Sequence, residues 1–192
     1  GMSYAYTVKS EKEGEVIYRK GGILTTAPLN KTPFSFAAYG DSRSNKSGHL
    51  EVAQAIANEN VPLVIHTGDI VYGDDLIEEW ISFFEVVEVL SDCVFYSAIG
   101  NHESEASNYT RFFAFPGNKR YYSFWYGDIF FVCLNTNEAF DKYSQQHAWL
   151  LTQLEEAKEK NPAFVIVYFH HPPYSYGAHG DHVYLKQYLV PV

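Results

Sequence analysis

The chain has 192 residues and a formal net charge of −9 at pH 7, because 23 Asp and Glu side chains outnumber 14 Lys and Arg. At about 150 residues per domain, this length fits one α/β core and excludes two full domains. Hydrophobic residues make up 46% and aromatic residues 17% of the chain, which excludes a disordered polymer. The acidic balance disfavours nucleic acid as the main partner. The longest apolar runs are far shorter than the roughly 20 residues that a membrane span needs.

The first 30 residues have the alternating pattern of an antiparallel strand pair. Two runs, residues 4–10 and 15–26, flank a charged turn at residues 11–14. Two strands alone are marginal in water, so we expect this hairpin to pack on the main domain or to be the remnant of a β-sandwich module. No targeting segment is visible in these residues, which leaves the cellular compartment open.

From Phe34 onward, apolar runs alternate with amphipathic segments, which is typical of an α/β fold. We predict strands at residues 34–39, 61–67, 93–99 and 163–169, a hairpin at 121–135, and helices at 48–60, 75–90, 144–160 and 182–190. Ser144 is the expected N-cap of the third helix. Both cysteines, Cys93 and Cys133, lie in strand-like runs, where we expect buried side chains without a catalytic role.

Several predicted strands end in polar residues that suit a metal site. The segments are Gly40-Asp41-Ser42-Arg43, Gly68-Asp69-Ile70-Val71-Tyr72, Gly100-Asn101-His102-Glu103 and Phe169-His170-His171. Ligands bind at the carboxyl ends of strands in open α/β sheets, because the loops there converge. Oxygen and nitrogen donors suit Zn²⁺, Mn²⁺ or iron, and Asp69 can bridge two ions through its two oxygens. The sequence therefore predicts a dinuclear metal site in outline.

Some of these residues also have a purely structural interpretation. The Asp and Asn residues at the three strand ends, taken singly, are typical turn residues after glycine. His66 lies inside a predicted strand, where we expect a hydrogen-bonded core histidine. Asp74 and Asp75 are expected to cap the helix that follows them. Adjacent side chains of an extended segment point to opposite faces, so only one residue of the pair at 170–171 is expected to bind a metal.

In this order and spacing, the four segments resemble the calcineurin-type metallophosphoesterase superfamily, and within it the purple acid phosphatase branch, over residues 34–192. Many members have Asp-x-His in the first segment, where this chain has Arg43. In the purple acid phosphatases that ligand is replaced by a Tyr three residues after the bridging Asp, which corresponds to Tyr72 here. The N-terminal segment is similar to the last hairpin of the fibronectin-like β-sandwich in that branch.

The resemblance implies a fold and a domain division. The fold is an α/β four-layer α/β/β/α sandwich with a short N-terminal β-hairpin. Residues 1–30 form the hairpin and residues 31–192 the metallophosphoesterase domain. The family pattern ends with a Gly-His-x-His segment that this sequence does not contain. We therefore expect the sandwich to be incomplete at its C-terminal side.

The resemblance also implies a ligand set. Asp41, Asp69 and Tyr72 would bind the first metal ion, and Asp69, Asn101 and His170 the second. Of the two adjacent histidines, His170 fits the family's His-x-Pro-x-Tyr spacing. The cofactors would be iron paired with zinc, manganese or a second iron. Two such ions about 3.5–4 Å apart hold the phosphoryl oxygens and supply a metal-bound hydroxide for attack on phosphorus.

The substrate implied is a small phosphate ester, and two histidines, His102 and His179, would face it. One of them would protonate the leaving group. Arg43 and Asn101 are the candidate substrate-binding residues, and for Arg43 an ion pair is an equally open interpretation. The branch also suggests a secreted or extracytoplasmic location. The sequence predicts no membrane partner and no nucleic acid as the main partner, and it leaves the oligomeric state open. The sequence leaves open a phosphodiesterase or nucleotidase on the same scaffold, and a silent module that binds no metal.

Overall fold

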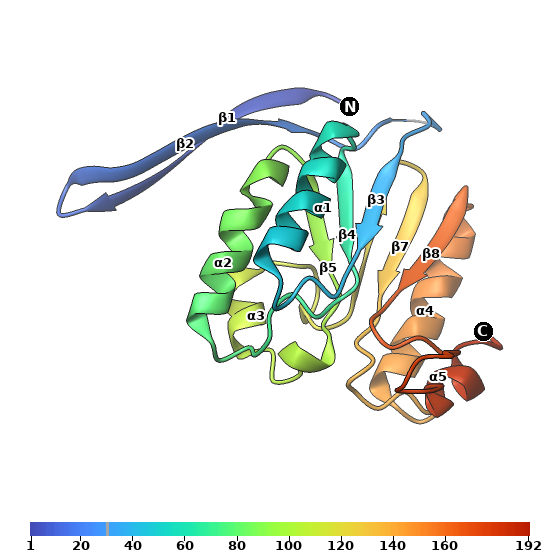
Figure 1. The fold of residues 1–192 in the computed structure, drawn as a ribbon. Helices are drawn as coiled ribbons and strands as arrows, with labels where there is room; N and C mark the ends of the chain where they lie inside the picture. Colours follow the sequence, from blue (N-terminus) through green and yellow to red (C-terminus); the bar gives the residue numbers. More distant parts are fainter. Residues whose placement is uncertain (30) are drawn as a thin grey trace.

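The computed structural model describes residues 1–29 and 31–192. Its centre is two three-stranded sheets that face each other (Figure 1). The first has the order β3 (Phe36–Tyr39), β4 (Leu63–His66) and β5 (Val94–Ser97), all parallel. The second has the order β6 (Tyr122–Tyr126), β7 (Ile129–Cys133) and β8 (Phe164–Tyr168), where β6 is antiparallel and β8 parallel to β7.

Helices cover the outer face of each sheet (Figure 1). The first sheet packs against α1 (Lys46–Asn58) and α2 (Ile77–Val87), which continues into the short η1 (Glu88–Leu90). The second sheet packs against α4 (Gln145–Lys160) and α5 (Val183–Tyr188). Two short helices, η2 (Asn101–Glu103) and α3 (Ser107–Phe112), lie between β5 and β6 in the chain. No described helix has the length and apolarity needed to cross a lipid bilayer.

Side-chain alternation along the strands produces the layers. In β4, Leu63 and Ile65 join the core between the two sheets, whereas Val64 joins the cluster under α1 and α2. In β7, Phe131 lies in the core between the sheets, whereas Phe130 packs toward α4 and α5. Successive residues of a strand point to opposite faces, so a continuous apolar run serves two cores at once. The four-layer α/β/β/α fold predicted from the sequence is confirmed.

The predicted strands and helices are present, with ends that shift by a few residues. Ser144 caps α4 as expected, because its hydroxyl accepts the N–H of His147 at 3.2 Å. Cys133 is buried and Cys93 partly buried. The expectation that Asp74 and Asp75 cap α2 was wrong. The N-cap position of α2 is held by Leu76, which makes no side-chain capping bond.

The carboxylate of Asp74 caps α3 instead, a helix that the sequence pattern did not reveal. It accepts the N–H groups of Asn108 and Tyr109, both at 2.9 Å, and the hydroxyl of Ser107 at 2.8 Å. The backbone N–H of Asp74 also donates to the carbonyl of His102 at 3.2 Å. One buried carboxylate therefore joins the loop after β4 to the segment after β5.

The N-terminal hairpin, β1 (Ser3–Lys12) and β2 (Glu15–Thr25), extends away from the sandwich (Figure 1). Its turn residues Glu13 and Gly14 have φ of 53° and 87°, as a type I′ turn requires. Polar contacts join it to the end of α2 and the residues that follow: Tyr6 donates to the carbonyl of Ser91 at 3.2 Å, and Lys20 pairs with Glu88 at 2.6 Å. Most of its side chains are exposed. Its similarity to a fibronectin-like module stays a prediction.

Candidate metal centre

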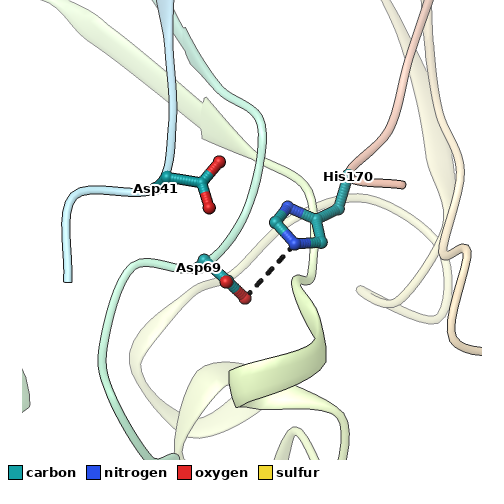
Figure 2. A group of neighbouring side chains, drawn as sticks. All are labelled: Asp41, Asp69 and His170. Carbon is teal, nitrogen blue, oxygen red and sulfur yellow. Dashed lines mark ion pairs between the residues drawn. The ribbon is translucent and has the colours of Figure 1, made fainter. Parts of the chain in front are cut away.

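Three strand ends bring a carboxylate pair and an imidazole together. Asp41 follows β3, Asp69 follows β4 and His170 follows β8. One donor atom from each lies within 4.8 Å of the other two. Figure 2 shows the three side chains pointing toward one another, with the imidazole Nε2 of His170 3.4 Å from Oδ1 of Asp69. Separations of this size leave room for one ion to contact all three groups.

The hydrogen bonds of His170 determine which of its nitrogens faces the centre. Its Nδ1 lies 3.0 Å from the carbonyl of Thr67, and a carbonyl only accepts, so Nδ1 carries the proton. Its Nε2 is therefore the nitrogen that faces Oδ1 of Asp69 and Oδ1 of Asn101, the latter 3.1 Å away. The imidazole nitrogen and the two oxygens therefore converge on one position. The donor set, one carboxylate, one amide oxygen and one imidazole, fits a transition metal ion.

Glycine precedes the ligands because the loops approach too closely for any side chain. Gly68 has φ of +98°, and a Cβ there would lie 2.7 Å from the backbone nitrogen of Gly100. A Cβ at Gly100 would lie 2.1 Å from Oδ1 of Asp69. The glycine pattern that marked the strand ends in the sequence is therefore a requirement for contact between the loops.

Asp41 and Asp69 both adopt the left-handed conformation, with φ of 53° and 56°. Such a conformation costs a non-glycine residue on the order of 1 kcal/mol, although Asp tolerates it better than most. Hydrogen bonds between the two loops hold it: the N–H of Asp41 donates to the carbonyl of Gly68 at 3.0 Å, and that of Arg43 to the carbonyl of Asp69 at 3.3 Å. The backbone thus places both carboxylates before any ion binds.

Glu103 is a residue of the centre that the sequence analysis missed. It is fully buried, and its carboxylate accepts the N–H groups of Asp69, Val71 and Gly100, each at 3.0 Å. Burial raises its pKa to about 7, while these three bonds oppose the rise. Its position three residues after Gly100 has the spacing of a capping box, which is the signal that could have identified it.

His66 is a core histidine, as expected. The N–H of Gly68 donates to its Nδ1 at 3.2 Å, so its Nε2 carries the proton and donates to the hydroxyl of Ser42 at 2.9 Å. Burial, with smaller contributions from the nearby His49 and His170, lowers its pKa to about 3. This neutral imidazole joins the loop of Asp41 to the loop of Asp69.

The centre opens into a cleft of about 410 Å³, whose other wall is the segment after β8. His102 and His179 both line it. Nδ1 of His102 donates to the carbonyl of Tyr72, so Nε2 is its free nitrogen, 3.9 Å from Oδ2 of Asp69. His179 lies on an exposed part of that segment. The structure therefore brings both predicted catalytic histidines to one cleft, and their roles stay predictions.

Tyr72 is the one predicted ligand that the structure does not bring to the other donors. Its side chain is 58% exposed and packs against the ring of His102, with centroids 5.2 Å apart. Within residues 1–29 and 31–192, its hydroxyl makes no hydrogen bond. Its role as a ligand stays a prediction.

Arg43 lies between the two carboxylates. Its Nη1 donates to Oδ1 of Asp41 at 2.8 Å and also to Oδ2 of Asp69. Of the two interpretations that the sequence left open, the structure contains the ion pair. Contact of Arg43 with a substrate phosphate stays a prediction, as does contact of Asn101.

A four-layer sandwich with this centre at its strand ends defines a metallophosphoesterase-like domain, and comparison with known proteins agrees. The calcineurin-like phosphoesterase family matches residues 34–191, so the chain belongs to this family. Relatives in Arabidopsis thaliana place it in the purple acid phosphatase-like branch. Probable inactive purple acid phosphatase 9 is 26% identical over 226 residues, covering 91% of this chain and 35% of that protein. Purple acid phosphatase 18 is 29% identical over 197 residues, covering 88% of this chain and 44% of that protein.

The chain therefore spans less than half the length of these two curated relatives. Among solved structures, purple acid phosphatase PPD1 from yellow lupin seeds has a TM-score of 0.77 at 19% identity, covering 92% of this chain and 38% of that one. A dimetal phosphatase from Danio rerio has a TM-score of 0.59 at 14% identity, covering 73% of this chain and 70% of that one. At these identities, the structural similarity establishes the fold alone.

Proposed function

We propose that the chain is a metal-dependent phosphoester hydrolase, a phosphomonoesterase of the purple acid phosphatase type with a dinuclear centre. The observation that carries the proposal is the convergence of Asp41, Asp69 and His170, whose donor atoms lie within 4.8 Å of one another beside an open cleft. Two bound ions, iron with zinc, manganese or a second iron, would supply positive charge for the phosphoryl oxygens and acidify the attacking water. The substrate is a small phosphate ester.

Each residue has a proposed role in holding this centre. Asp41 and Tyr72 bind the first ion, Asn101 and His170 bind the second, and Asp69 offers one carboxylate oxygen to each. The orientation of His170 supports its assignment, because Nδ1 donates to the Thr67 carbonyl and Nε2 faces the oxygens of Asp69 and Asn101.

The leaving alkoxide needs a proton, and we assign this role to one of the two histidines that line the cleft, His102 or His179. Nδ1 of His102 donates to the Tyr72 carbonyl, so Nε2 is the nitrogen through which His102 would transfer a proton in the cleft. His179, on the opposite wall, is the second candidate. Arg43 and Asn101 are the proposed contacts for the non-bridging phosphate oxygens.

The test is hydrolysis by the purified chain after removal of metals and reloading with Zn²⁺, Mn²⁺ or iron in separate samples. p-Nitrophenyl phosphate reports monoester cleavage and bis-p-nitrophenyl phosphate reports diester cleavage. Asp69→Asn should lower kcat/KM by at least about a hundredfold and release both ions, because one carboxylate serves both positions. Asp75→Asn is the matched control, since Asp75 is an exposed carboxylate six residues along the same loop.

Faster cleavage of the diester than of the monoester would support the phosphodiesterase or nucleotidase instead. A chain that binds metal yet hydrolyses neither ester with any of the three ions would refute the proposal. Loss of a single ion in Asp69→Asn would contradict the bridging role.

A further inference from the structure

The carboxylate of Asp69 divides its two oxygens between two different positions. Oδ1 faces Nε2 of His170 at 3.4 Å and accepts the N–H of His102 at 3.1 Å. Oδ2 faces the guanidinium of Arg43, whose same nitrogen also bonds Oδ1 of Asp41 at 2.8 Å. Two cation-attracting positions therefore flank one carboxylate, and one of them already contains a cation.

The guanidinium at this position neutralises a charge that cannot reach water. The side chain of Asp69 is 1% exposed, so its carboxylate needs a nearby positive charge or several hydrogen-bond donors. Arg43 supplies that charge at every accessible pH, because a guanidinium does not lose its proton. Its own side chain is 28% exposed and that of Asp41 is 64% exposed, so the guanidinium has a route into solvent.

We propose that Arg43 is a built-in competitor for the metal position between Asp41 and Asp69. The position formed by Asp69, Asn101 and His170 fills first. The second ion enters only by displacing the guanidinium, and it binds more weakly for that reason. This inference rests on the metal centre of the proposed function and adds an order of filling that the proposed function does not contain.

A measurement of Mn²⁺ binding to the metal-free chain by titration calorimetry tests the inference directly. Mn²⁺ prefers oxygen and nitrogen donors and so avoids the two cysteines. The unmodified chain should bind two ions in separate steps of unequal affinity. Arg43→Gln should tighten the weaker step by about tenfold or more and leave the stronger step unchanged. Arg43→Lys, which keeps the positive charge, should keep the second step weak.

Lys46→Gln is the matched control for a general change of charge. Lys46 lies three residues after Arg43 and pairs with Glu85 on the surface of α2, where its side chain is 55% exposed. It has no contact with Asp41 or Asp69 among the described residues. Equal tightening in Arg43→Gln and Lys46→Gln would overturn the inference, because net charge alone would then explain the effect.

Thermal melting gives a readout that is independent of metal affinity and of activity. In EDTA, Arg43→Gln should melt about 4 °C or more below the unmodified chain, since the buried carboxylate of Asp69 loses its counter-charge. In saturating Mn²⁺ the difference should vanish or reverse, because the ion replaces the guanidinium. A deficit of the same size in both conditions would overturn the inference, since Arg43 would then be a structural ion pair that metal does not displace.

The two proposals fail in different ways. If Arg43→Gln binds both Mn²⁺ ions with the same affinities as the unmodified chain, the competitor role is overturned and the hydrolase proposal still stands. Tightened binding in Arg43→Gln without ester hydrolysis supports the competitor role and counts against the hydrolase. A chain and variants that bind no Mn²⁺ at all overturn the competitor role, and the hydrolase proposal is then decided by hydrolysis in the Zn²⁺ and iron samples.

Discussion

Replacement of Asp74 tests whether one carboxylate joins two segments that are far apart in the sequence. Asp74 is 5% exposed, and its carboxylate accepts three hydrogen bonds from the first turn of α3. Two of the donors are backbone N–H groups of a helix N-terminus, which have no partner within the helix. Asp74→Ala removes all three acceptor contacts at once.

The expected cost follows from those contacts. Loss of an N-cap costs about 1–2 kcal/mol. The N–H of Tyr109 is fully buried, so leaving it without an acceptor costs about 1–3 kcal/mol of stability. The half-buried Asn108 regains water and adds little. We therefore expect Asp74→Ala to lower the free energy of unfolding by about 3 kcal/mol, and Asp74→Asn, which keeps one acceptor oxygen, by about 1 kcal/mol.

Urea denaturation followed by far-UV circular dichroism measures these differences, with Asp75→Ala as the control. Asp75 is exposed, and its side chain makes no hydrogen bond within the described part of the chain, so its replacement should change stability by less than about 0.5 kcal/mol. If Asp75→Ala costs as much as Asp74→Ala, the pair caps α2 after all. A loss below about 1 kcal/mol in Asp74→Ala would refute the three-contact reasoning.

Two further predictions concern the loops of the centre. The pKa of His66 is lowered from 6.5 to about 3, so between these pH values His66 binds a proton in the unfolded chain but not in the folded chain. Stability should therefore fall as pH drops from about 6.5 toward 3. His66→Asn should reduce that slope by up to about 1.4 kcal/mol per pH unit in urea denaturation, and an unchanged slope would contradict the buried neutral imidazole. Gly68→Ala should weaken Mn²⁺ binding in calorimetry, because its Cβ would lie 2.7 Å from the nitrogen of Gly100, and unchanged affinity would show that the loops can separate.

The sequence could nominate candidate ligands at the strand ends because their signal is local. Each buried strand is a continuous apolar run, and the glycine after it marks the point where two loops touch. Parallel strands then bring their carboxyl ends to one edge of the sheet, so three separate motifs become one site. Asp41 and Asp69 could be assigned to that site from these rules alone.

The partners of Asp74 and Glu103 could not be predicted in the same way. Capping rules connect a residue to a helix that begins within about three positions of it. Asp74 caps a helix whose first three residues lie 33 to 35 positions later. Glu103 has a local partner in Gly100, which fits the rule, but its bonds to Asp69 and Val71 span 34 and 32 positions. Such contacts depend on how the two loops pack against each other, and the hydrophobic periodicity of the sequence does not predict that packing.

The environment of Asp69 explains why Arg43 should control metal binding. Its N–H donates to Glu103 at 3.0 Å, its carbonyl accepts the N–H of Arg43 at 3.3 Å, and its Oδ1 accepts the N–H of His102 at 3.1 Å. These three contacts come from backbone or buried groups and can persist when an ion binds. The bonds from the Arg43 guanidinium to Oδ2 of Asp69 and to Oδ1 of Asp41 are the ones that an ion must replace. Because the carboxylate of Asp69 is already fixed in place, displacement of the Arg43 side chain is the main reorganisation that the second ion requires, and the affinity of that ion should follow the strength of these two bonds.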